Sequence, residues 1–123
     1  MITEDYVSFE TAKLLKEKGF NEIKCNTCYK WNGNFCNNRR SMSGIDNEIC
    51  YQAPTLQMAM KWLRKAHKWH IEISRGEYGY FAYIMSTKNL SAENYSVQLE
   101  GRYDLSYEEA CEAAIKYCLE NLI

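Results

Sequence analysis

Two hydrophobic periods follow each other along the chain. In some segments apolar side chains recur every three or four residues, which predicts helices with one buried face. In others they recur every second residue, which predicts strands with one buried face. The expected helices cover residues 8–20, 54–69 and 105–123, and the clearest expected strands cover residues 70–74, 78–86 and 93–105.

Residues that favour helix ends support these boundaries. Ser8 can accept hydrogen bonds from the first amides of the first helix. Ser106 and Glu109 have the spacing of a capping box before the last helix. Pro54 suits the first position of the second helix, and Thr55 is the alternative cap.

A β-hairpin is expected around Asn32-Gly33, which stands between two β-favouring runs. This pair favours a two-residue turn because both turn residues need a positive φ. Such a turn places Tyr29 opposite Cys36, and it puts Cys28 and Cys36 on opposite faces of the hairpin. A further short strand is expected at residues 49–52.

These elements predict the α+β class. We expect a single domain over residues 1–123, in which about three helices cover an antiparallel sheet in two layers, in the order α-β-β-(β)-α-β-β-β-α. The expected core comprises Phe9, Leu15, Leu56, Ala59, Leu63, Ile71, Ile73, Val97, Leu99, Cys111, Ala114, Cys118 and Leu122.

The composition is that of an ordinary globular chain. Of its 123 residues, 46% are hydrophobic and 25% are charged, and the net charge is −1. No global field therefore attracts nucleic acid or a membrane surface. No apolar run approaches the roughly 20 residues of a membrane span. The acidic N-terminus does not resemble a signal peptide, so we expect a cytoplasmic protein with reduced thiols and no membrane partner.

Six cysteines raise the question of a metal or redox site. The candidate zinc ligands are Cys25, Cys28, Cys36 and Cys50. A structural zinc site needs four converging ligands, and the expected hairpin keeps these thiols apart. A reactive Cys-x-x-Cys pair belongs at a helix N-terminus, whereas this one precedes a hairpin. We therefore expect no metal and no cofactor, and a zinc-stabilised domain through Cys25 and Cys28 is kept as an alternative.

No catalytic constellation is visible in the sequence. His67 and His70 are three residues apart, but no third metal ligand lies nearby. The chain has no glycine-rich phosphate loop and no nucleophile with a patterned base. We therefore predict that the protein is not an enzyme.

The second helix carries basic and aromatic residues together, and surfaces of this kind hold phosphates and stack bases. Tyrosines in the predicted strands are further candidates, because aromatic residues dominate binding hot spots. The binding candidates are Trp62, Trp69, Lys61, Arg64, Lys65, Lys68, Tyr78, Tyr80 and Tyr83. Arg39 and Arg40 could extend the basic surface.

Three segments, "VSFETAKLLKEKGF", "APTLQMAMKWLR" and "SYEEACEAAIKYCLENLI", resemble a family of small proteins encoded by gut bacteria of the Bacteroides group and by their phages and plasmids. The segments coincide with the three predicted helices. The resemblance implies a cytoplasmic, mobile-element setting, and it carries over no activity, cofactor or catalytic residue.

The sequence therefore favours a small non-catalytic accessory protein of a mobile element that binds a protein partner. The alternative is a nucleic-acid-binding module that uses the helix at residues 54–69. The zinc-stabilised domain is the second alternative. The oligomeric state stays open, a dimer included.

Overall fold

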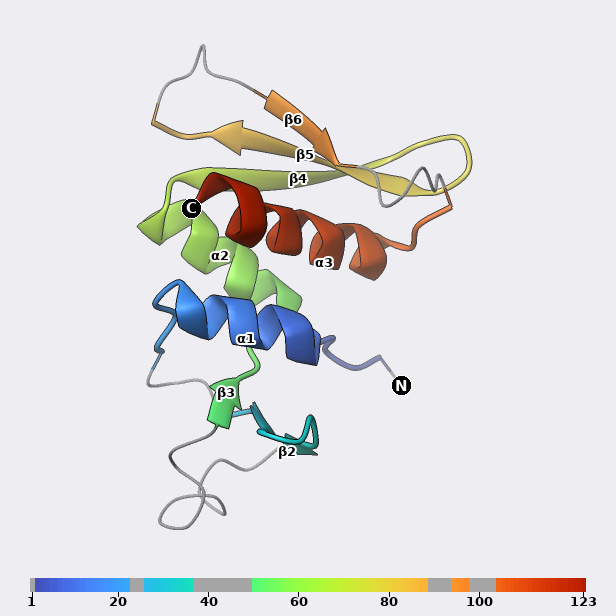
Figure 1. The fold of residues 1–123 in the computed structure, drawn as a ribbon. Helices are drawn as coiled ribbons and strands as arrows, with labels where there is room; N and C mark the ends of the chain where they lie inside the picture. The colour runs from blue at the N-terminus through green and yellow to red at the C-terminus, as the bar shows by residue number, and fades with distance from the viewer. Residues whose placement is uncertain (1, 23–25, 37–49, 89–93, 98–103) are drawn as a thin grey trace. The chain divides into compact units, whose positions relative to one another are not determined.

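The computed structural model describes residues 2–22, 26–36, 50–88, 94–97 and 104–123 (Figure 1). The chain divides into two compact units, Met1–Thr55 and Leu56–Ile123. Each unit combines helix with antiparallel strands, so the predicted α+β class is confirmed. The prediction of a single sheet is wrong, because the short strands of the first unit pair only with one another among the described residues. That residues 1–123 act as a single domain stays a prediction.

The first unit begins with helix α1, Phe9–Glu17. The Ser8 side chain accepts a hydrogen bond from the Thr11 amide, as its capping role predicts. At the other end Gly19 has a φ of +93°. The Phe20 amide donates to the Leu15 carbonyl, which completes a Schellman stop.

Three short strands form the sheet of the first unit, in the order β2-β1-β3. They are β1 Cys28–Lys30, β2 Phe35–Cys36 and β3 Cys50–Gln52. Tyr29 lies between Phe35 and Tyr51 in the register of the three strands. The Phe9 ring of α1 packs 5.6 Å from Tyr29 and 5.7 Å from Tyr51, centroid to centroid. An aromatic layer therefore joins the helix to the sheet.

The predicted register of the β1–β2 hairpin is wrong by one residue. The Lys30 amide donates to the Asn34 carbonyl, so the loop has three residues rather than two. Within this loop only Gly33 has a positive φ, +88°, which is the geometry of a type I turn followed by a left-handed glycine. The shift places Cys28 directly opposite Cys36. The two cysteines therefore lie on the same face, not on opposite faces.

The second unit has the order helix, three strands, helix. Its elements are α2 Leu56–Ala66, β4 Trp69–Arg75, β5 Tyr80–Ser86, β6 Asn94–Val97 and α3 Tyr107–Tyr117, which continues as one π-helical turn, Cys118–Leu122. Thr55 immediately precedes α2. The prediction that Pro54 takes the first helical position is therefore wrong. The Pro54 carbonyl accepts a hydrogen bond from the Val7 amide.

Helices α2 and α3 cover one face of the β4-β5-β6 sheet (Figure 1). The face toward the helices carries Ile71 opposite Ile84 and Ile73 opposite Ala82. The capping box at the start of α3 is confirmed: the Glu109 amide donates to Ser106 Oγ at 3.1 Å, and the Ser106 amide donates to Glu109 Oε1 at 3.0 Å.

Most of the predicted core residues are buried. The confirmed ones are Leu15, Leu56, Ala59, Leu63, Ile71, Cys111, Ala114 and Cys118. Phe9, Ile73 and Leu122 are half-buried. Val97 and Leu99 lie outside the side chains that the structure describes.

Candidate functional site

The face of the β4–β5 pair that points away from α2 and α3 is here called the outer face. Side chains alternate along each strand, so every second residue of β4 and β5 belongs to it. Its members are His70, Glu72, Ser74, Phe81, Tyr83 and Met85, and the register pairs His70 with Met85, Glu72 with Tyr83, and Ser74 with Phe81.

Tyr83 lies at the centre of the outer face and is 39% exposed. The Phe81 ring packs edge-on against it, with centroids 5.2 Å apart and planes at 79°. Glu72 is opposite Tyr83 on the neighbouring strand and is exposed. The outer face therefore presents the Tyr83 ring, the half-buried Phe81 ring and a carboxylate, with no lysine or arginine among its six members.

The structure separates the three predicted tyrosine anchors. Tyr83 lies on the outer face, while Tyr78 lies in the β4–β5 turn and is 75% exposed. Tyr80 is half-buried, and its ring packs 5.7 Å from Tyr107 at 84°. Phe81 and Met85 were not among the predicted candidates. Their spacing of two from Tyr83 was the signal that could have identified them.

Four basic residues form an exposed stripe that begins on α2, here called the basic stripe. Its members are Lys61, Arg64, Lys65 and Lys68, and all four are exposed. Spacings of three and four place Lys61, Arg64 and Lys65 on one side of α2, and Lys68 lies just beyond the helix. Lys68 follows the helix with a φ of +63°, and its Nζ donates to the Lys65 carbonyl at 3.1 Å. Basic groups near a helix C-terminus also interact favourably with the helix dipole, so the stripe has a structural use as well.

The tryptophans that the sequence grouped with these cations are only half-exposed. Trp62 packs against the His67 ring, with centroids 4.7 Å apart. Trp69 belongs to β4 and shares the face of Ile71, toward the helices. Arg39 and Arg40 lie outside the described residues. The structure therefore keeps the cations at and just beyond α2 but does not place both indoles beside them.

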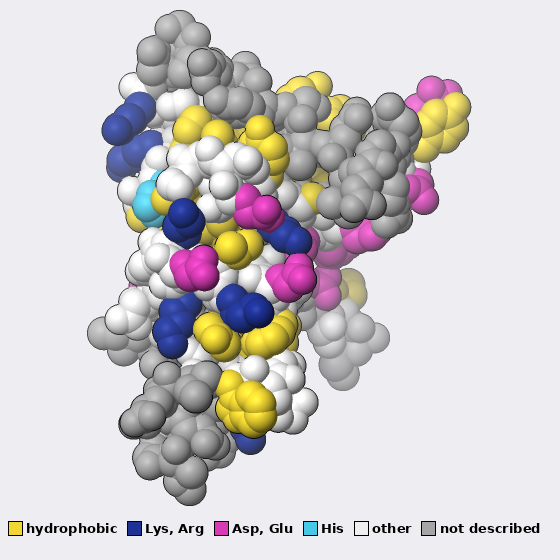
Figure 2. All heavy atoms as spheres, in the orientation of Figure 1, with side chains coloured by type: hydrophobic (Ala, Val, Ile, Leu, Met, Phe, Trp, Pro, Cys, Tyr) yellow, Lys and Arg dark blue, Asp and Glu magenta, His cyan; other side chains and the backbone are white. Residues whose placement is uncertain are grey.

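Charge is mixed on the face of the molecule that Figure 2 draws. Lysine and arginine side chains alternate there with aspartate and glutamate, and hydrophobic side chains reach the surface between them (Figure 2). Mixed surfaces of this kind produce no long-range field of a single sign.

The candidate metal ligands do not converge in the described part of the chain. Cys28 is buried opposite Cys36, while Cys50 is opposite Lys30. Cys25 lies outside the described residues. Where the structure describes side chains, no three histidine, cysteine, aspartate or glutamate residues come together as a metal site requires. His67 lies just after α2, whereas His70 belongs to β4.

Two buried thiols on the last helix are weak nucleophiles at neutral pH. Burial raises the pKa of the Cys111 thiol to about 11 and that of the Cys118 thiol to about 12. For Cys111 the carboxylates of Glu108 and Glu112 act in the same direction, and a hydrogen bond from Tyr107 opposes them. Both thiols are therefore mainly protonated at pH 7, which makes them weaker nucleophiles than an exposed cysteine.

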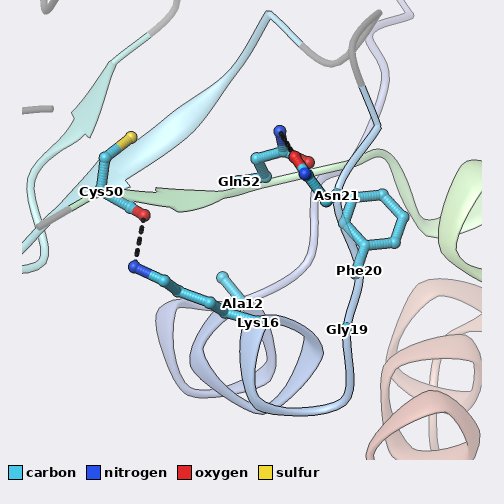
Figure 3. A pocket seen from close by; sticks show the side chains of 7 residues that line it. All are labelled: Ala12, Lys16, Gly19, Phe20, Asn21, Cys50 and Gln52. Atoms are coloured by element: carbon cyan, nitrogen blue, oxygen red, sulfur yellow. Dashed lines mark hydrogen bonds between the residues drawn. The ribbon is translucent and has the colours of Figure 1, made fainter. Parts of the chain in front are cut away.

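A pocket of about 490 Å³ lies in the first unit, between the end of α1 and strand β3 (Figure 3). Its described lining residues are Ala12, Lys16, Gly19, Phe20, Asn21, Cys50 and Gln52. Lys16 is the only charged one among them. Its Nζ donates to the Cys50 carbonyl at 3.4 Å and lies 5.1 Å from the centre of the Tyr51 ring.

The amide groups of this pocket are largely satisfied by the protein itself. Gln52 Nε2 donates to Asn21 Oδ1 at 3.4 Å and to the Glu22 carbonyl at 3.2 Å. Gln52 Oε1 accepts a hydrogen bond from the Glu22 amide at 2.9 Å. These bonds fasten β3 to the residues that follow α1, which gives the amides a structural role.

No described helix is both long enough and apolar enough to cross a membrane. In comparisons with known proteins, no family model, curated protein or solved structure matches the chain.

Proposed function

We propose that this protein is a small non-catalytic accessory protein of a mobile element, which binds a protein partner in the cytoplasm through the outer face of β4 and β5. One observation carries the proposal: Tyr83 stands at the centre of a sheet face that the helices leave open, buttressed by Phe81. Aromatic side chains held rigidly at the centre of a surface are the usual anchors of protein interfaces.

The charge of the outer face indicates what kind of partner it fits. Glu72 lies beside Tyr83 and has the same sign as phosphate, and none of the six members of this face is a lysine or arginine. The face therefore offers no lysine or arginine to the phosphates of a nucleic acid. It suits an apolar protein surface that carries a lysine or arginine opposite Glu72, because such a pair fixes the orientation of the complex. The mobile-element setting rests on the family resemblance of the three helices.

Tyr83→Ala is expected to weaken partner binding at least tenfold, which corresponds to about 1.4 kcal/mol. Truncating a central aromatic anchor commonly has an effect of this size or larger. The measurement uses immobilised wild-type protein to retain partners from a lysate of a Bacteroides-group bacterium. Quantitative mass spectrometry then compares the proteins retained by the variant with those retained by the wild type. Each retained protein is purified, and its affinity for the wild type and for the variant is measured.

Tyr78→Ala is the matched control, because Tyr78 is the more exposed tyrosine but lies in the turn rather than on the outer face. This variant is expected to retain the same partner with unchanged affinity. Equal retention by wild type and Tyr83→Ala, with both proteins folded by circular dichroism, would show that the outer face is not the binding surface.

The basic stripe supports nucleic-acid binding as a second candidate function. Four exposed cations on and just beyond one helix can neutralise phosphates of a single strand or of one groove edge. The stripe belongs to a different element from the outer face. The two candidates therefore differ in which residues they require and in how binding responds to salt.

If the stripe binds nucleic acid, affinity for DNA or RNA is expected to fall about 100-fold between 50 and 200 mM salt, as the release of counterions from four phosphate contacts requires. Fluorescence anisotropy with single- and double-stranded oligonucleotides measures this. The control is a variant in which Lys61, Arg64, Lys65 and Lys68 are all changed to glutamate. Binding that persists in this variant, or that does not respond to salt, would rule out the stripe.

A further inference from the structure

The corrected hairpin register brings two thiols face to face. Cys28 on β1 is directly opposite Cys36 on β2, and both side chains carry thiols in this structure. Lys30 and Asn34 form a hydrogen-bonded pair. Such pairs alternate along an antiparallel ladder, so Cys28 and Cys36, two residues further along each strand, occupy a position of the same kind.

The typical Cα spacing at such a position is within the range that a disulfide needs. Opposite residues of a hydrogen-bonded antiparallel pair have Cα atoms about 5.5 Å apart. Disulfides join residues whose Cα atoms are about 4.4–6.8 Å apart. Cβ atoms of opposite residues are about 4.5–5.5 Å apart, against about 3.5–4.5 Å in a disulfide, so the two strands must approach slightly. A bond closed in this way is easily reduced again, as in regulatory disulfides.

We propose that Cys28 and Cys36 are a reversible oxidation site, which a small disulfide such as oxidised glutathione converts into a cross-strand disulfide. The site lies in the first unit, so it is independent of the outer face of the second. The remaining described cysteines are poorly placed to compete. Cys50 is opposite Lys30, diagonal to Cys28, and Cys111 and Cys118 belong to the second unit.

The reaction proceeds in two exchanges. Cys36 is half-buried and Cys28 is fully buried, so the small disulfide reacts first with the Cys36 thiolate. The sulfur–sulfur bond of the small disulfide breaks, one small thiol leaves, and a mixed disulfide forms on Cys36. Cys28 is buried while the strands are paired, so it reacts when they separate: its thiol then loses a proton to solvent, attacks Cys36 Sγ and displaces the second small thiol. In total, two protein thiols are oxidised and one small disulfide is reduced to two thiols, which take up the two protons.

The new bond changes the mobility of the hairpin. It closes a ring through the loop whose turn is formed by Gly33, and this loop carries Trp31, which is 62% exposed. Cross-linking the two strands removes openings in which they separate. Oxidation therefore holds Trp31 and the strands β1 and β2 in a single arrangement.

The test treats the full reduced chain with oxidised glutathione, quenches with acid, and measures intact mass and cross-linked peptides. We expect the loss of two hydrogen atoms per chain and one cross-linked peptide joining Cys28 to Cys36. Amide exchange of Lys30 and Gly33 should slow on oxidation, and reduction should reverse both changes. The Cys25→Ser and Cys50→Ser variants should behave like wild type, because neither residue belongs to the pair.

The Cys36→Ser variant should form no cross-link, and circular dichroism checks that it keeps its fold. A mixed disulfide that persists on Cys36 of the wild-type chain would overturn the proposal. So would a cross-link in which Cys25 or Cys50 replaces either partner, or a chain that stays fully reduced.

Discussion

Replacing Leu63 by alanine is expected to lower the free energy of unfolding by about 2–5 kcal/mol. Leu63 lies on α2, is 0% exposed, and belongs to the helix that packs on β4 and α3. Truncation removes buried methyl groups and leaves a cavity that neighbouring side chains fill only in part. Urea denaturation followed by circular dichroism measures the change.

Lys65→Ala is the matched control for Leu63→Ala. Lys65 is an exposed residue of the same helix, and alanine is at least as good a helix former. Its substitution is expected to change stability by no more than about 0.5 kcal/mol. If the two variants unfold at the same urea concentration, the packing described for α2 is contradicted.

Gly79→Ala is expected to cost about 1–3 kcal/mol, because a new Cβ has no space at this position. It would lie 2.8 Å from the carbonyl carbon of Asp104 and 2.8 Å from the Leu105 oxygen. Both contacts are backbone atoms, so no flexible side chain can move aside. The neighbouring Tyr80 amide donates to the same Leu105 oxygen at 2.9 Å, which holds the β4–β5 turn close to the start of α3.

Thermal or urea unfolding checks the Gly79 prediction against Glu77→Ala, an exposed position in the same turn. The Glu77→Ala variant should leave stability almost unchanged, because this substitution adds no atom beside a backbone segment. A Gly79→Ala protein as stable as wild type would show that the turn does not lie against residues 104 and 105.

The ends of the helices were predictable because they depend on local chemistry. Ser8 caps α1, and Gly19 ends it with a left-handed φ. The Ser106 and Glu109 side chains form the reciprocal bonds expected of a capping box. Each of these interactions joins residues within three or four positions of one another, so the sequence contains all the partners.

The hairpin register was not predictable in the same way. Asn-Gly is compatible with a two-residue turn and with a three-residue turn that ends in a left-handed glycine. The choice is made by partners distant in sequence, since Tyr29 must meet both Phe35 and Tyr51 and also pack against Phe9. A change of one residue reverses the faces of the strand, and this is why the cysteine pair was missed.

The outer face was only half predictable. The period of two shows which residues of β5 share a face, but β5 is apolar on both sides. Ala82 and Ile84 point one way, and Phe81, Tyr83 and Met85 point the other. Hydrophobicity alone cannot decide which set the helices cover. The packing of α2 and α3 decides it, and it leaves the aromatic set open.

Hydroxyl-radical footprinting of the protein with its retained partner tests the binding surface most directly, because it reads the exposure of individual side chains. The proposed interface predicts that labelling of Tyr83, Phe81 and Met85 falls when the partner is bound, while labelling of Tyr78 stays constant. Protection of Trp62 beside the basic stripe, with Tyr83 labelled as strongly as in the unbound protein, would contradict binding through the outer face.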